Sequence, residues 1–148
     1  MIRIGFLSPS LLIAASIQIL CQLFKVVYYS IRERRLQWHR FFHPAGMPSA
    51  HSAFVTALTV CIAAYNGIRS DLFALSFVFS VIIIYDTFRL RGAVQSHSRI
   101  ILKLARGLPE SERQRLPRYI GHTGAEIIAG VLIGGLWGLL FSRFLIPL

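Results

Sequence analysis

The sequence has 148 residues, of which 55% are hydrophobic and only 15% are charged, and its formal net charge is +10. This composition is far too apolar for an ordinary soluble domain, in which roughly a quarter of the residues are charged. Long uncharged apolar runs also exclude a nucleic-acid-binding protein, despite the excess of positive charge. We therefore expect one transmembrane domain, residues 1–148, whose basic loops face anionic lipid or a phosphate-bearing substrate.

Four apolar runs predict an all-α integral membrane protein with about four transmembrane helices, at residues 7–31, 49–68, 72–88 and 121–146. Each run is long enough to cross a hydrocarbon core of ~30 Å as a helix. The second and third runs are separated only by a short turn at Asn66-Gly67, which predicts an antiparallel hairpin.

Two weaker patterns accompany these runs. Gly130, Gly134 and Gly138 recur at every fourth position, which predicts a face that another helix can approach closely. Residues 95–116 alternate apolar and basic side chains at helical spacing, which favours a basic amphipathic segment in the membrane interface over a solvated loop. The oligomeric state is left open, a homo-oligomer included.

The distribution of charge predicts the topology. The first and third connections, with the adjoining helix ends, carry thirteen of the sixteen Lys and Arg residues, and the other side carries Arg3, Arg69 and Arg143. The positive-inside rule therefore places both basic connections in the cytoplasm and both termini outside. We expect the inner (plasma) membrane of a bacterium; in an organelle the same rule would point to the matrix or stroma.

Polar residues gather at the four helix ends on this basic side: Lys25, then Ser49 and His51, then Asp86, then His122 and Glu126. Ionisable groups at this depth are costly and usually line a site. A helix start also presents free N–H groups and a partial positive charge, both of which attract phosphate. Two such starts, each with a histidine and with Lys and Arg around them, predict a phosphate pocket. One imidazole can attack phosphorus and another can donate a proton.

Each of these residues also has a simpler interpretation. Thr123 and Glu126 have the spacing of a capping box. A single interfacial histidine is commonly a solvated or capping residue. Asp86, expected at a helix C-terminus, opposes the helix dipole and is therefore expected to pair with Lys25, Arg89 or Arg91, as part of the structure or of the site.

Two blocks of the sequence carry a resemblance to a known family. They are Met47-Pro48-Ser49-Ala50-His51-Ser52 and Gly121-His122-Thr123, and they follow Gln22-Leu23-Phe24-Lys25 in the chain. In this order they resemble the divergent branch of the type-2 phosphatidic acid phosphatase (PAP2) superfamily, which is related to acid phosphatases and vanadium haloperoxidases. The resemblance covers nearly the whole chain.

The wider superfamily has three motifs. Lys25 and Arg32 keep the spacing of Lys-x6-Arg-Pro, with Glu33 in place of the proline. Residues 48–51 match Pro-Ser-Gly-His with alanine in place of glycine, and residues 122–126 keep the His-x3-acid spacing of the third motif with Glu for Asp. The Ser-Arg pair of that motif is absent, and Arg115 and Leu116 stand in its place.

The resemblance implies a role for each matching residue. His122 would be the nucleophile, Glu126 would orient it, and His51 would be the general acid. The phosphate would be bound by the following residues: Lys25, Arg32, Ser49, Ala50, Arg91 and Arg115. No metal or other cofactor is expected.

These observations lead to a main hypothesis and two alternatives. The main hypothesis is a phosphatase that hydrolyses a lipid phosphomonoester or diphosphate, such as phosphatidylglycerol phosphate or phosphatidate, at the cytoplasmic face through a phosphohistidine. The first alternative, which the absent Ser-Arg pair favours, is a non-catalytic protein that binds anionic lipid phosphates or scaffolds a membrane complex. A transporter component ranks lower, because the outer halves of the helices are almost entirely apolar. The expected partners are membrane lipid and a lipid phosphate, with no nucleic acid.

Overall fold

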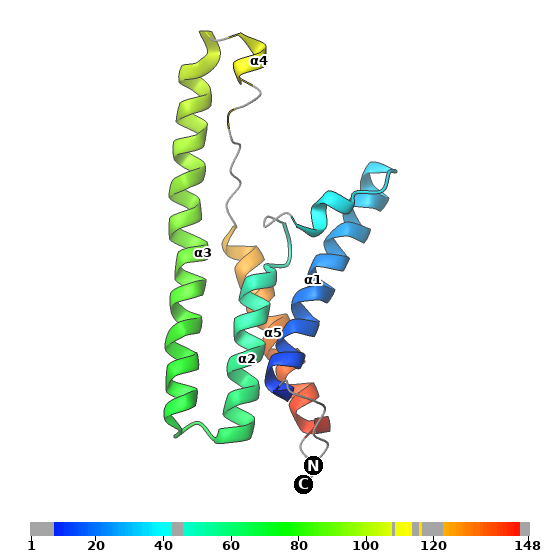
Figure 1. Cartoon of the computed structure of the whole chain (residues 1–148), viewed down its shortest axis with the longest axis vertical. Coiled ribbons are helices and arrows are strands. Elements are labelled where there is room, and N and C mark those ends of the chain that lie inside the picture. Colours follow the sequence, from blue (N-terminus) through cyan, green and yellow to red (C-terminus); the bar gives the residue numbers. More distant parts are fainter. Residues whose placement is uncertain (1–7, 43–45, 108, 114–115, 117–122, 146–148) are drawn as a thin grey trace.

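The computed structural model describes residues 8–42, 46–107, 109–113, 116 and 123–145, and in this part of the chain every regular element is a helix. The long helices are α1 (Pro9–Glu33), α2 (Ala50–Asn66), α3 (Asp71–Leu104) and α5 (Gly124–Leu145). Short helices follow α1 and α3: η1 (Trp38–Phe41), η2 (Ala105–Gly107) and α4 (Glu110–Arg113). In Figure 1, α1 begins and α5 ends at the end of the molecule that carries the α2–α3 turn. The prediction of an all-α fold is confirmed.

Three of the helices are long and apolar enough to cross a membrane, namely α1, α3 and residues 124–143 of α5. The fourth, α2, is a shorter apolar helix of 17 residues. Serine side chains cap the N-termini of α1, α2 and α3. The hydroxyl oxygens of Ser8, Ser49 and Ser70 accept hydrogen bonds from the backbone N–H groups of Leu11, Ser52 and Phe73, respectively. The predicted starts of these helices are therefore correct to within two residues, because small polar caps define them.

The third helix differs from its prediction. It does not end near Phe88 but continues without a break to Leu104, so the beginning of the predicted interfacial segment at 95–116 belongs to α3. The reason is local: residues 89–104 contain no proline, and their single glycine, Gly92, does not interrupt the helix. Because α3 continues, Asp86 lies inside a helix and does not oppose the dipole of a helix end.

Helices α2 and α5 pack backbone against backbone along the predicted glycine face. A Cβ atom added at Gly130 would lie 2.4 Å from the carbonyl oxygen of Ser49, and one at Gly134 would lie 2.2 Å from that of Ala53. A Cβ at Gly138 would lie 3.0 Å from the carbonyl oxygen of Ala57. The partner residues on α2 therefore recur at the same four-residue spacing as the glycines. The prediction of a close helix approach at this face is confirmed.

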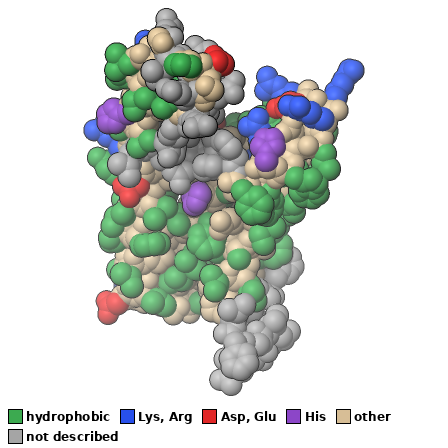
Figure 2. All heavy atoms as spheres, turned by 45° about the horizontal axis from the view of Figure 1, so that its top comes forward, with side chains coloured by type: hydrophobic (Ala, Val, Ile, Leu, Met, Phe, Trp, Pro, Cys, Tyr) green, Lys and Arg blue, Asp and Glu red, His purple; other side chains and the backbone are tan. Residues whose placement is uncertain are grey.

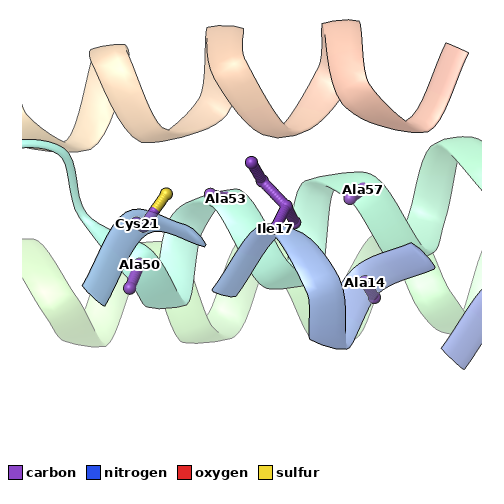
Figure 3. Packing of buried hydrophobic residues seen from close by; sticks show 6 residues of the cluster. All are labelled: Ala14, Ile17, Cys21, Ala50, Ala53 and Ala57. Carbon is purple, nitrogen blue, oxygen red and sulfur yellow. The ribbon is translucent and has the colours of Figure 1, made fainter. Parts of the chain in front are cut away.

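Small residues also form the core between α1 and α2. The core cluster comprises Ala14, Ile17, Cys21, Ala50, Ala53 and Ala57, which Figure 3 shows with the α5 ribbon alongside. Helix α3 packs against the other side of α2 through buried hydroxyl groups. The Thr59 hydroxyl lies 2.9 Å from that of Ser76 and 2.7 Å from that of Ser80. Because apolar contacts gain little in lipid, close packing and such hydrogen bonds hold the helices together.

Candidate functional site

The starts of α2 and α5 are joined at the basic end of the bundle. The backbone N–H of Ser49 donates a hydrogen bond to the carbonyl oxygen of Glu126, at 2.9 Å. The close approach at Gly130 lies one turn further along α5. Two helix N-termini, which the sequence places 74 residues apart, therefore meet at one point. This is the arrangement on which the predicted phosphate pocket depends.

Lys25 lies beneath the connection that leads into α2. Its side chain is only 1% exposed, and its Cδ would lie 3.8 Å from a Cβ added at Gly46. Gly46 has a φ of +106°, and a Cβ added there would lie 3.2 Å from the Tyr29 hydroxyl, so both its backbone conformation and the space around it favour glycine. A lysine this deeply buried in a membrane-spanning helix indicates a functional or ion-pairing position.

Glu126 takes part in a capping box at the start of α5. The Thr123 N–H donates to Glu126 Oε2 at 3.1 Å, and the Glu126 N–H donates to Thr123 Oγ1 at 3.3 Å. The capping role considered from the sequence is therefore real. It does not exclude a second role, because a carboxylate has two oxygens and several acceptor positions.

Glu126 and Arg32 line one cavity, of about 370 Å³, between α1 and α5. Aromatic and apolar side chains complete its wall: Phe24, Tyr28, Tyr29, Met47, Pro48, Ala129 and Ile133. An apolar groove lined by Leu20, Cys21 and Trp137 shares Phe24, Pro48 and Ile133 with this cavity. The predicted phosphate ligand Arg32 and the predicted orienting acid Glu126 are thus brought to the same cavity.

His51 lines a different cavity, of about 440 Å³, that we call the amide cavity. Its other lining residues are Ala15, Gln18, Ile19, Gln22, Phe41 and Phe42. On α1, Gln22 and Tyr29 lie three residues before and four residues after Lys25, so all three share one helix face. Because Gln22 lines the amide cavity and Tyr29 lines the other, Lys25 occupies the face of α1 that the two cavities have in common.

Ser49 and Ala50, which were expected to bind phosphate, have structural roles in the described residues. The Ser49 hydroxyl accepts hydrogen bonds from the N–H and the hydroxyl of Ser52, and both serines are fully buried. Ala50 belongs to the core cluster. Both residues are thus held by packing and hydrogen bonds at the start of α2, directly before His51 in the chain.

Arg40 is a residue that the sequence did not single out for this region. Its guanidinium stacks on the Tyr29 ring at 4.3 Å and lies 3.3 Å from a Glu33 carboxylate oxygen. Glu33 also accepts from the Gln37 side chain, so it ties η1 to the end of α1. Figure 2 shows Lys and Arg gathered at this end of the molecule, while hydrophobic side chains cover much of the flank below.

The described part of the chain does not place the remaining predicted residues in this arrangement. His122 and Arg115 lie outside the described residues, as does the side chain of Arg91. Asp86 is exposed on α3, and among the described side chains no ion pair involves it. Its expected pairing with Arg89 is therefore absent from the described structure.

Comparison with known proteins places the chain in a family. A family model described as "Divergent PAP2 family" matches residues 7–137. The uncharacterized membrane protein YuiD of Bacillus subtilis (strain 168) is 35% identical over 140 residues, which cover 85% of this chain and 89% of the relative. No solved structure matches the chain.

Proposed function

The chain belongs to the divergent PAP2 family, and on this premise we propose that it is a lipid phosphate phosphatase of the membrane. Its substrate is a lipid phosphomonoester or diphosphate, such as phosphatidylglycerol phosphate or phosphatidate. Its site faces the cytoplasm of a bacterial cell, because the positive-inside rule assigns the basic end of the bundle to that side.

The proposed reaction has two steps. A nitrogen of His122 attacks phosphorus, the P–O bond to the lipid alcohol breaks, and His51 supplies the proton that the departing oxygen takes. Water then attacks the phosphohistidine and gives its proton to His51, which releases inorganic phosphate and restores both histidines. Glu126 orients His122, four residues earlier in the chain. Lys25 and Arg32 meet the charge on the phosphate oxygens.

The observation that carries the proposal is the hydrogen bond between Ser49 and Glu126. It supports a single site because it joins the first turns of α2 and α5, each of which holds or adjoins a motif histidine. Lys25 lies close to Gly46, which is three residues before Ser49 in the chain. Helix N-termini and a buried ammonium group suit a phosphate dianion in charge and in hydrogen bonding.

The test measures phosphate release from a panel of phospholipid and polyprenyl phosphates by the purified protein in detergent. We expect vanadate-sensitive release from at least one lipid, and a loss of about 10³-fold or more in His122→Ala, which lacks the nucleophile. Brief reaction followed by alkaline quenching should trap a phosphoenzyme in the unaltered protein only. Full activity of His122→Ala would overturn the mechanism.

One observation favours a second function, the non-catalytic binding of anionic lipid. The capping box already employs the Glu126 carboxylate, so this residue has a reason to be present in a protein that does not catalyse. In that case lipid phosphates would raise the unfolding temperature of the protein, and no lipid of the panel would release phosphate.

A further inference from the structure

The amide cavity and the cavity of Arg32 and Glu126 are lined by different residues, and the two linings differ in chemistry. Apart from His51, its described lining residues include no acidic or basic side chain, whereas the other cavity has one of each. Its volume of about 440 Å³ lies within the usual range for small-ligand pockets, roughly 300–1,000 Å³. The amide cavity is therefore suited to a neutral group and not to the phosphate itself.

Two glutamines give this cavity its polarity. Gln18 and Gln22 are one helical turn apart on α1 and both line it. The side-chain oxygen of Gln22 is buried and has no hydrogen-bond partner among the described residues. Buried polar groups are nearly always paired, so an acceptor left over inside a membrane-spanning helix indicates a ligand that donates a hydrogen bond. A hydroxyl group meets this requirement without adding charge.

The position of His51 relates this cavity to the reaction. In the proposed function, His51 protonates the oxygen that leaves phosphorus, so the leaving alcohol lies on the side of the site that His51 lines. Gln22 is one turn from Lys25 on the same helix face. Because Lys25 binds the substrate phosphate in the proposed function, Gln22 lies close to that phosphate. Phe41 and Phe42 form the apolar wall, and the 50%-exposed side chain of Ile19 borders the outer side, where a lipid chain can leave toward the bilayer.

We propose that the amide cavity receives the leaving group of the substrate and selects an alcohol that carries a further hydroxyl, as in a glycerol head group. This inference rests on the proposed function and narrows its substrate class. Gln22 accepts the hydrogen bond of that hydroxyl, and Gln18 extends the same polar surface. Gln22 is thus a specificity-determining residue.

The kinetic test compares two substrates that differ by one hydroxyl group. These are phosphatidylglycerol phosphate and its deoxy analogue, in which propane-1,3-diol replaces the head-group glycerol, with identical acyl chains. We expect the unaltered protein to favour the hydroxylated lipid in kcat/KM by about fivefold or more, the effect of one buried hydrogen bond. Gln22→Leu should remove this preference, mainly by slowing the hydroxylated substrate. Leu23→Ala, at a residue that lines neither cavity, should retain it.

A binding measurement separates this inference from the proposed function, because it requires no turnover. The unfolding temperature is measured with phosphatidylglycerol and with phosphatidylmethanol, which carry the same charge and chains but differ in the head-group hydroxyls. We expect phosphatidylglycerol to stabilise the unaltered protein more, and Gln22→Leu to be stabilised equally by both lipids. Equal stabilisation of the unaltered protein would overturn the inference, even if phosphate is released. If phosphatidylglycerol stabilises the protein more but no lipid releases phosphate, the leaving-group role and the proposed function are both wrong. The amide cavity would then be a binding site for a lipid head group.

Discussion

The backbone N–H of Ser49 and the carbonyl oxygen of Glu126 are 2.9 Å apart, and this contact joins the first turns of α2 and α5. It is possible because residue 130 is a glycine: any side chain there would collide with the Ser49 carbonyl, 2.4 Å from the Cβ position. The glycine face of α5 therefore does more than hold two helices together. It also determines how close the two groups of site residues come.

Substitution at the glycine face should separate packing from helix propensity. We expect Gly134→Ala to destabilise the protein by about 1–3 kcal/mol, because its Cβ would overlap the backbone of Ala53. Gly135→Ala is the matched control, since its Cβ would meet only Thr56 at an ordinary 3.8 Å. Thermal denaturation in detergent measures both. Equal effects of the two variants would show that the backbone contact contributes nothing.

Substitution of Glu126 should distinguish its capping role from a role in the reaction. Glutamine can still accept the Thr123 N–H bond of the capping box, so Glu126→Gln should leave the unfolding temperature nearly unchanged. It removes the negative charge, however, and we expect phosphate release to fall by about 10²-fold or more. Glu126→Ala should lose both properties. Undiminished activity in Glu126→Gln would limit the residue to capping.

Replacement of Lys25 should test its role in phosphate binding. Methionine has a similar length and no charge, so Lys25→Met keeps the packing of the buried stem, and its unfolding temperature shows how much the ammonium group stabilises the fold. Binding of inorganic phosphate or vanadate should weaken by about tenfold or more, as expected from the loss of a charged hydrogen bond. Vanadate inhibition measures the affinity for the anion, and thermal denaturation measures the stability of the variant. Unchanged vanadate affinity would remove Lys25 from the phosphate site.

The hydroxyl cluster between α2 and α3 should make a measurable contribution to stability. Thr59→Val keeps the shape of the side chain but removes the hydroxyl that bonds to Ser76 and Ser80, so we expect a loss of about 1 kcal/mol. Thr56→Val, on the side of α2 that faces Gly135, is the control and should be nearly neutral. Denaturation of the two variants under one set of conditions makes the comparison. A neutral Thr59→Val would show that the serines find other partners.

The sequence alone was sufficient to predict the helices, the close approach at Gly130, Gly134 and Gly138, and the capping box of Thr123 and Glu126. All of these depend on interactions within a few residues of the chain or on the simple contrast between lipid and water. The predicted end of α3 is wrong. The basic segment after Phe88 contains no proline, so nothing in it prevents the helix from continuing.

Only the tertiary structure placed Arg32 and Glu126 on one cavity and His51 on another, with Lys25 on the helix face between them. The sequence predicts that these residues contribute to a phosphate site, but not which of the two cavities each of them lines. The cavity that each residue lines depends on how α1 is rotated about its axis relative to α2 and α5. That rotation follows from the packing of Ile17, Cys21, Ala50 and Ala53, which no local pattern in the chain specifies.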